Sequence, residues 1–228
     1  MTVAPALLLD LDGTLSDNFS GIAASIRHAL AALHAPDTDD AMLRTCVGPP
    51  LRESFARLIQ GADARLVERA IDAYRERYGA LGWQENVAYP GIGTALEALA
   101  AQGARLFVCT SKPEPYAKRI VAHFGFDAFI ERVYGADLRG SLDDKRKLLA
   151  HLLASEALEP RRCAMVGDRH HDIRAARANG TQAIGVLWGY GAREELVDAD
   201  RLLARPEELA TLAAPIAQQA GREPQSSA

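Results

Sequence analysis

The sequence predicts an α/β fold: a parallel sheet with helices on both faces, and a helical segment inserted after the first strand. Short apolar runs typical of buried strands alternate with segments of helical period. The runs are "ALLLDLD", "ARLFVCTS", "RCAMVGD" and "TQAIGVLWG", and the helical segments are residues 91–102, 114–123, 143–154 and 170–179. Parallel strands joined by right-handed crossovers show this alternation, because each crossover helix packs on one face of the sheet.

One long interval, residues 18–86, breaks this alternation. It contains consecutive amphipathic helical patterns, such as "GIAASIRHALAAL" and "ARLVERAIDAYRERY", and no strand pattern. We therefore expect a sheet domain made of residues 1–17 and 87–218, with residues 18–86 as an inserted helical domain. The final residues, 219–228, are small and polar and are expected to form a flexible tail.

Composition and charge narrow the classes of partner. The chain has 228 residues and a net charge of −4, which argues against nucleic acid or an anionic membrane as a partner. Its three cysteines are widely spaced, which favours reduced, buried thiols over a disulfide framework or a zinc site. No apolar run reaches the roughly 20 residues of a membrane span. We therefore expect a cytoplasmic protein, and no pattern predicts its oligomeric state.

Polar side chains follow the predicted strands, at the edge where open parallel sheets bind ligands. They are carboxylates and hydroxyls, in chain order Asp10, Asp12, Thr110, Ser111, Asp168 and Asp172. Four carboxylates at one edge repel one another unless a cation lies among them. Oxygen ligands at this density favour Mg²⁺ over zinc, which prefers nitrogen and sulfur.

Four motifs follow one another along the chain: "DLDGT" at residues 10–14, the hydroxyl pair at 110–111, Lys145 within "SLDDKRKLL", and "GDRHHD" at 167–172. Their order resembles that of the haloacid dehalogenase-like phosphohydrolases. The resemblance covers residues 6–190 and implies a Rossmann-like core whose helical insert is an α-helical cap. The segments "VGPPLRESF", "YPGI" and "TSKPEPYAKRI" are most similar to the phosphoglycolate phosphatase-like branch.

This resemblance implies a Mg²⁺-dependent phosphomonoester hydrolase that works through an aspartyl phosphate. Asp10 would attack phosphorus, and Asp12 would protonate the leaving oxygen and later activate water. Strand alternation directs both carboxylates to one side and Leu11 into the core, so both can face one phosphoryl group. The metal would be held by Asp10, the backbone carbonyl of Asp12 and Asp168, with Asp172 in support.

The phosphate group is expected to meet a turn and a strand end. Gly13 allows a sharp turn and offers an amide to the phosphate. Thr110, or the amide of Ser111, can donate to a phosphate oxygen. Closure of the insert over the substrate would then expel water during the attack.

Two cationic roles complete the expected site. Lys145, at a predicted helix start, would balance the nucleophile and the phosphate, with Lys147 and Lys112 as open alternatives. In the phosphoglycolate phosphatase-like branch the loop that corresponds to "VGPPLRE" faces the active site. This resemblance makes Arg52 the candidate for binding a second anionic group of the substrate. His170 and His171 are expected to be structural or solvent-facing, because Mg²⁺ disfavours imidazole.

The expected substrate is a small phosphorylated metabolite such as phosphoglycolate. Alternatives are a 5'-nucleotidase acting on nucleoside monophosphates, a phosphohexomutase, and a binding protein of the same fold with low turnover.

Two other motifs are excluded by the spacing of their glycines. The glycine of "DLDGTLSDN" is fourth instead of sixth, as a calcium loop would need, and "GIGTAL" lacks the third glycine of a dinucleotide fingerprint.

Overall fold

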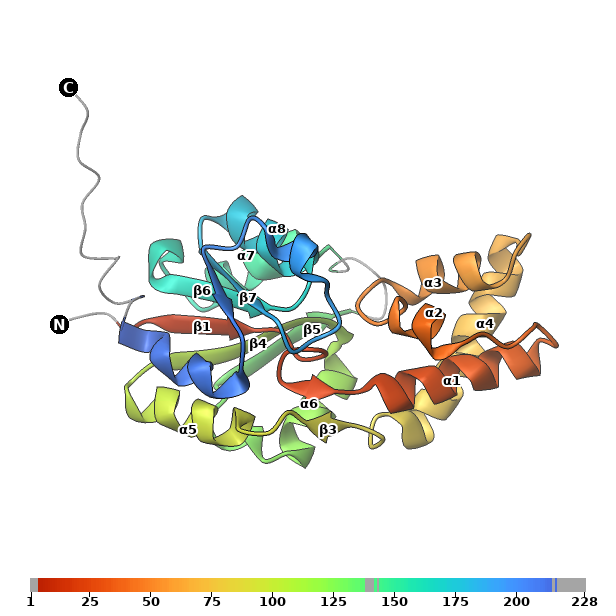
Figure 1. Cartoon of the computed structure of the whole chain (residues 1–228), viewed down its shortest axis with the longest axis horizontal. Coiled ribbons are helices and arrows are strands. Elements are labelled where there is room, and N and C mark those ends of the chain that lie inside the picture. Colours follow the sequence, from red (N-terminus) through yellow and green to blue (C-terminus); the bar gives the residue numbers. More distant parts are fainter. Residues whose placement is uncertain (1–3, 138–141, 143, 215, 217–228) are drawn as a thin grey trace, which may run out of the picture.

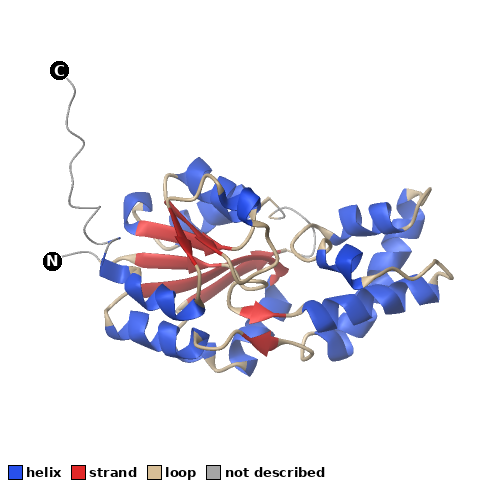
Figure 2. Cartoon of the chain, viewed as in Figure 1, coloured by secondary structure: helices blue, strands red, loops and turns tan. Residues whose placement is uncertain are grey.

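The computed structural model describes residues 4–137, 142, 144–214 and 216. Within these residues six parallel strands form one sheet in the order β5-β4-β1-β6-β7-β8 (Figures 1 and 2). The strands are β1 (Ala6–Leu9), β4 (Arg105–Pro113), β5 (Arg132–Ala136), β6 (Cys163–Gly167), β7 (Gln182–Val186) and β8 (Arg201–Leu203). The predicted α/β fold is thereby confirmed.

Side chains of the central strand β1 pack alternately into two apolar layers, one on each face of the sheet. Leu7 and Leu9 pack into a cluster with helices α5 (Ile92–Ala101) and α6 (Glu114–His123). Ala6 and Leu8 pack into a second cluster with α7 (Lys145–Ser155) and α8 (His170–Asn179), so the two helix pairs cover opposite faces of the sheet (Figure 1). Short helical turns complete this part of the chain: η2 (Phe126–Ala128), η3 (Pro160–Arg162), η4 (Arg193–Leu196) and η5 (Pro206–Thr211).

The helical insert, defined as residues 18–86, has an apolar cluster of its own that includes Ile26, Phe55 and Ile71. Its helices are α1 (Phe19–Ala32), α2 (Asp40–Arg44), α3 (Leu51–Leu58), α4 (Ala64–Arg77) and the π-helical turn η1 (Tyr78–Gly82). Asp39 and Asp63 cap α2 and α4 by accepting from backbone amides of the first turn. The insert extends away from the carboxyl edge of the sheet (Figure 1).

A short antiparallel ribbon joins the insert to the sheet. Strand β2 (Ser16–Asp17) pairs with β3 (Val87–Ala88), so the chain enters and leaves the insert side by side. We call these residues, together with Asn18 and Phe19, the hinge. The predicted boundaries at residues 17–18 and 86–87 fall at this ribbon, and the division into domains stays a prediction.

The sequence patterns missed four strands, β2, β3, β5 and β8. Three of them have two or three residues, too few for any alternation to appear. β5, "RVYGA", carries a glycine, which weakens a strand pattern. Helix α7 begins at Lys145 instead of 143 because the Asp144 side chain accepts from the Arg146 amide and caps it. The predicted tail, residues 219–228, lies outside the described residues.

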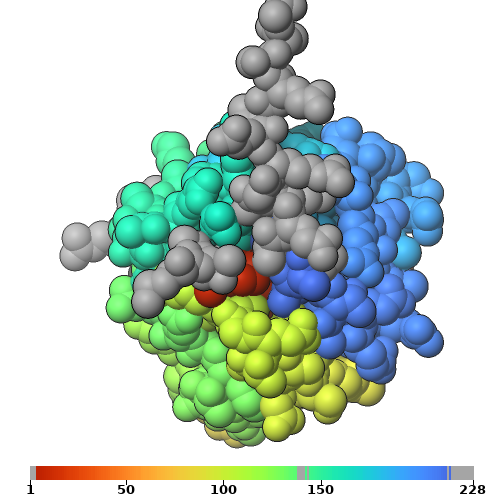
Figure 3. All heavy atoms as spheres, turned by 90° about the vertical axis from the view of Figure 1, so that its left-hand side faces the viewer, coloured from red at the N-terminus to blue at the C-terminus, as the bar shows by residue number. Residues whose placement is uncertain are grey.

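The end of the core away from the insert brings distant segments together. In Figure 3 the first described residues, in red, lie beside dark-blue residues near the end of the described chain.

All three cysteines are free and buried, as predicted. None of the helices in the described part of the chain has the length and apolar character of a membrane span.

Candidate active site

The polar residues at the carboxyl edge meet where the strand order reverses. β4 lies on one side of β1 and β6 on the other, and ligands bind at such a switch point in open parallel sheets. Asp10 follows β1, Asp168 follows β6, and Asp172 lies in the first turn of α8. Leu11 is fully buried in the core, as the strand alternation predicted.

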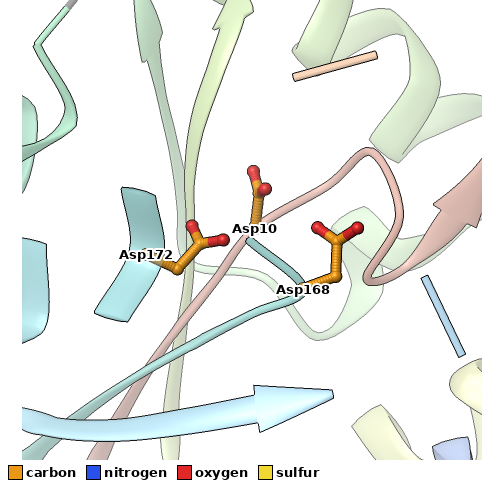
Figure 4. A group of neighbouring side chains, drawn as sticks. All are labelled: Asp10, Asp168 and Asp172. Carbon is orange, nitrogen blue, oxygen red and sulfur yellow. The ribbon is translucent and has the colours of Figure 1, made fainter. Parts of the chain in front are cut away.

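Three carboxylates form a buried cluster at this point. Oxygen atoms of Asp10, Asp168 and Asp172 lie within 4.8 Å of one another (Figure 4). Burial, and then the charges of Asp172 and Asp10, raise the pKa of Asp168 to about 7. Burial also raises the pKa of Asp172, although Lys145 acts in the opposite direction. At Asp168, burial and the two like charges outweigh the hydrogen bond from the Tyr190 amide and the positive charge of Arg169, which act in the opposite direction on its pKa.

The carboxylate of Asp168 is bound on one oxygen only. Its Oδ2 accepts from the amides of Tyr190 at 2.7 Å and Gly191 at 3.3 Å. Its Oδ1 is buried and has no hydrogen-bond donor among the described residues. An oxygen held in this way beside two further carboxylates is the donor set that a hard divalent cation requires, so the residues present fit Mg²⁺.

Two lysines reach the carboxylates. Lys145 Nζ lies 2.9 Å from Asp10 Oδ1 and also forms an ion pair with Asp172. Lys112 Nζ lies 2.6 Å from Asp12 Oδ2. Burial opposes the charge of each ammonium, but the neighbouring carboxylates outweigh it and raise the pKa of both lysines. Lys147 is exposed.

The predicted phosphate-binding residues Thr110, Ser111 and Gly13 differ in whether their polar groups are already hydrogen-bonded within the protein. Thr110 is buried, and its Oγ1 accepts from the Lys112 amide at 3.2 Å; Ser111 lines the same cavity. Gly13 has a φ of +83°, as a sharp turn requires. Its amide donates to the Ser16 carbonyl at 2.8 Å, so the expected free amide is not found.

The expected substrate-binding arginine has a partner within the insert. Arg52 lies on α3 with its side chain 71% exposed, and its Nη2 is 2.6 Å from Glu68 Oε1 on α4. It does line the edge of the cavity. Sequence spacing placed Arg52 near the site but could not reveal this ion pair.

The histidines of the "GDRHHD" motif differ in their surroundings. His170 Nδ1 lies 2.8 Å from Glu195 Oε2, whereas His171 lines the cavity. Burial, and then the neighbouring His170, lowers the pKa of His171 to about 4, so its imidazole is neutral at neutral pH.

Two residues of the site were missed by the sequence patterns. Arg169 Nη1 donates to the Val47 carbonyl of the insert at 2.7 Å, and its Nε lies 3.0 Å from Glu195. Tyr190 reaches from the sheet to the hinge. The available signal for Tyr190 was "WGYG", a glycine-rich segment at the end of a predicted strand run at the same edge.

The site opens into a cavity of about 880 Å³ between the sheet and the helical insert. The core contributes the carboxylates and lysines described above. The insert and α6 contribute a largely apolar wall, formed by Val47, Pro49, Leu51, Ile71, Tyr74, Tyr78 and Tyr116. Tyr74 and Tyr78 stack with ring centroids 5.4 Å apart, and Tyr116 meets Tyr78 edge to face. The cavity thus has a charged floor and an aromatic wall.

Known proteins share this arrangement of sequence and fold. A 5'-nucleotidase from Pseudomonas aeruginosa is 43% identical over 84% of this chain and 86% of its own. The tyrosine-protein kinase PtkA of Mycobacterium tuberculosis is 44% identical over 84% of this chain, which spans 65% of that protein. A phosphoglycolate phosphatase from Haemophilus influenzae is 30% identical over 79% of this chain and 84% of its own.

Solved structures and a family model agree with these relatives. The structure of "a predicted phosphatase from Clostridium acetobutylicum" has a TM-score of 0.85 and 34% identity, covering 92% of this chain and 97% of that one. The family model described as haloacid dehalogenase-like hydrolase matches residues 7–186. The chain therefore belongs to the haloacid dehalogenase-like hydrolase family and is a phosphatase.

Proposed function

We propose that this phosphatase hydrolyses the phosphomonoester of a small metabolite, with Mg²⁺ held by Asp10, the backbone carbonyl of Asp12, Asp168 and Asp172. The observation that carries the proposal is the buried carboxylate cluster, in which Asp168 Oδ1 has no hydrogen-bond donor among the described residues while Lys145 contacts two of the carboxylates. When bound, Mg²⁺ supplies positive charge that offsets the carboxylates and the transferring phosphate.

Asp10 and Asp12 divide the chemistry between them. An oxygen of Asp10 forms a bond to phosphorus as the bond to the ester oxygen breaks, and Asp12 gives that oxygen a proton. Water then attacks the aspartyl phosphate, Asp12 takes a proton from it, and inorganic phosphate leaves. Lys112, 2.6 Å from Asp12, binds the carboxylate form. The carboxylate form is the one that accepts a proton from water in the second half-reaction.

The substrate class has two candidates with separate support. Phosphoglycolate is supported by the motif resemblance and by the relative named phosphoglycolate phosphatase. A nucleoside monophosphate is supported by the relative named 5'-nucleotidase and by a cavity of about 880 Å³. The size of the cavity favours the nucleotide, since glycolate would leave most of it unused.

The test is phosphate release by the purified protein with Mg²⁺ from 2-phosphoglycolate, nucleoside monophosphates and sugar phosphates. Asp10→Asn serves as the blank, and Asp127→Asn, on the exposed turn η2, as the matched control. We expect Mg²⁺-dependent release that EDTA stops, that Asp10→Asn lowers by at least about a thousandfold, and that Asp127→Asn leaves unchanged. Unchanged release in Asp10→Asn would remove the proposed nucleophile.

Two further readouts separate the alternatives. Isomerisation of a sugar phosphate without phosphate release would identify a mutase, and tight phosphate binding without turnover would identify a binding protein. Asp12→Asn is expected to slow both half-reactions: acid quenching and mass spectrometry follow the formation of phosphorylated Asp10, and phosphate release follows its hydrolysis. Full steady-state activity of Asp12→Asn would exclude the acid–base role.

Arg52 can be tested against its own partner. If Arg52 binds a second anionic group, Arg52→Ala should lower the activity more with a carboxylated or doubly charged substrate than with p-nitrophenyl phosphate. Glu68→Gln should have the opposite effect, because it frees the guanidinium from its ion pair. Equal losses with both substrates would assign Arg52 to holding α3 against α4.

A further inference from the structure

Tyr190 makes contacts in two directions from one short segment. Its backbone amide donates to Asp168 Oδ2 at 2.7 Å, and its hydroxyl donates to Asp17 Oδ1 at 2.6 Å. The same hydroxyl oxygen accepts from the amides of Asn18 at 3.0 Å and Phe19 at 3.1 Å. One residue of the core thus contacts both a proposed metal ligand and the hinge of the insert.

The hydroxyl supplies a cap that helix α1 lacks. The N-cap residue of α1, Asn18, makes no side-chain capping bond. The first amides of a helix have no partner within the helix, and a side-chain oxygen normally accepts from them. Here the Phe19 amide has two such acceptors: Asp17 Oδ1 at 3.0 Å and the hydroxyl of Tyr190, which also accepts from the Asn18 amide 172 residues earlier in the chain. The start of the insert is therefore held by the core.

The segment around Tyr190 is packed tightly on Asp168. A Cβ at Gly189 would lie 2.4 Å from the Cβ of Asp168, and a Cβ at Gly191 would lie 1.9 Å from its carbonyl oxygen. Across the carboxylate, a Cβ at Gly13 would lie 2.4 Å from Asp168 Oδ2. Because a side chain at these positions would clash with Asp168, the backbone around Tyr190 lies in direct contact with it, and a rotation of the carboxylate disturbs the Tyr190 amide bound to Oδ2.

We propose that Tyr190 is a positioning residue that couples occupancy of the cation site at Asp168 to the conformation of the hinge. Without a cation, Asp168 faces two like charges within 4.8 Å and is pushed away from them. A cation on its free Oδ1 holds the carboxylate in place, and through it the Tyr190 backbone and hydroxyl. The hinge is then held at Asp17, Asn18 and Phe19. The inference rests on the metal site of the proposed function.

The test compares Mg²⁺ binding with hydrogen exchange at the hinge. Tyr190→Phe removes the hydroxyl but keeps the backbone amide on Asp168. Tyr134→Phe is the matched control, since its hydroxyl donates to Glu156 at 2.5 Å on the other side of the core. Calorimetry measures the Kd for Mg²⁺, and exchange mass spectrometry follows peptides spanning residues 16–22 with and without the ion.

In the native chain and in Tyr134→Phe, Mg²⁺ should slow exchange of the Asn18 and Phe19 amides at least about fivefold. In Tyr190→Phe the Kd should stay within about threefold of native, while the slowing falls below about twofold. Asp17→Ala keeps Tyr190 but removes both its acceptor and the oxygen that accepts from the Phe19 amide, so the slowing by Mg²⁺ is compared at Asn18 in this variant and should also be reduced there. It serves as the second variant if Tyr190→Phe unfolds, as judged by circular dichroism.

Two results would overturn the coupling: Mg²⁺ binding to the native chain without protection of the hinge, or equal protection in Tyr190→Phe and the native chain. Failure of the native chain to bind Mg²⁺ would instead remove the metal site itself, and the coupling with it. Calorimetry distinguishes these cases, and neither depends on the identity of the substrate.

Discussion

At the scale of single residues, the site is a balance of buried charges. Asp10, Asp168 and Asp172 crowd together, and Lys145 offsets only two of them. Because Lys145 neutralises the carboxylates only in part, their burial destabilises the fold when no cation is bound: a buried carboxylate close to like charges resists ionisation. The site is therefore arranged to bind positive charge at the expense of stability in the metal-free protein.

Replacement of Asp168 should make this cost measurable. Its folded-state pKa of about 7 lies above the ordinary 3.8, so the folded protein binds a proton that the unfolded chain releases. Without metal, this bound proton contributes to the free energy of unfolding fully below about pH 4, and the contribution is lost as the pH rises toward 7. In EDTA at about pH 7.5, Asp168→Asn should be more stable than the native chain by on the order of 3 kcal/mol, measured by urea unfolding.

Near about pH 4.5 the two proteins should differ little, because Asp168 is then protonated in the folded state. Added Mg²⁺ should stabilise the native chain at about pH 7.5 and leave Asp168→Asn nearly unaffected. A variant that is less stable than the native chain in EDTA at the higher pH would contradict this account of Asp168.

Two neighbouring lysines allow a matched test of cationic function. Lys145 is buried against Asp10, whereas Lys147 is exposed two positions further along the same helix. Lys145→Met removes a donor from the nucleophile and the phosphate, and kcat should fall by roughly a hundredfold or more. Lys147→Met should keep native kcat and KM. Equal effects of the two substitutions on phosphate release would exclude the role of Lys145.

At the scale of elements, Arg169 of the core is bound to the loop 47–50 of the insert. Arg169 follows Asp168 directly, donates to the Val47 carbonyl and pairs with Glu195. Glu195 keeps a lowered pKa of about 2: its burial is outweighed by hydrogen bonds from His170 and Arg169. The guanidinium is thus oriented by a charged partner at neutral pH, and the loop 47–50 is fixed over the cavity.

Release of this contact should loosen the loop. Arg169→Gln is expected to lower kcat/KM for the preferred metabolite about tenfold and to speed amide exchange in peptides covering residues 45–51. Arg205→Gln, on an exposed arginine that pairs with nearby Glu208, is the control and should change neither quantity. Unaltered exchange in Arg169→Gln would show that other contacts hold the loop.

At the scale of the whole molecule, the sheet with its helices and the insert meet at one cavity. The insert has its own buried cluster, and the sheet has one on each face. The ribbon of β2 and β3 brings Asp17 beside Val87, so the insert enters and leaves through a narrow passage. This arrangement allows the chemistry to reside in the sheet and selectivity to reside in the insert.

Deletion of the insert tests that division. A short glycine-serine turn between Asp17 and Val87 should suffice, because the two residues are paired neighbours. The shortened chain is expected to fold, to bind Mg²⁺, and to hydrolyse p-nitrophenyl phosphate slowly, with rates for different metabolites within about threefold of one another. Retention of native selectivity, measured as kcat/KM ratios, would place the specificity in the sheet domain.

The sequence by itself determined the elements of the site that depend on local rules. Strand alternation placed Asp10 and Asp12 on one side with Leu11 in the core, and the parallel order of strands brought Asp168 to the same edge. Helix α6 and helix α8 have the predicted limits, because helical period and end residues are local signals. The parallel sheet and the long helical insert followed from the same patterns.

Only the tertiary structure decided which side chains meet across the cavity. Lys112 and Lys145 contact different carboxylates, Arg52 is bound by Glu68, and the Gly13 amide is used within its own turn. Long side chains reach partners far away in sequence, as Tyr190 reaches the hinge, and no spacing rule encodes such a contact. The sequence therefore determined where the chemistry resides, and packing decided how each charge is held.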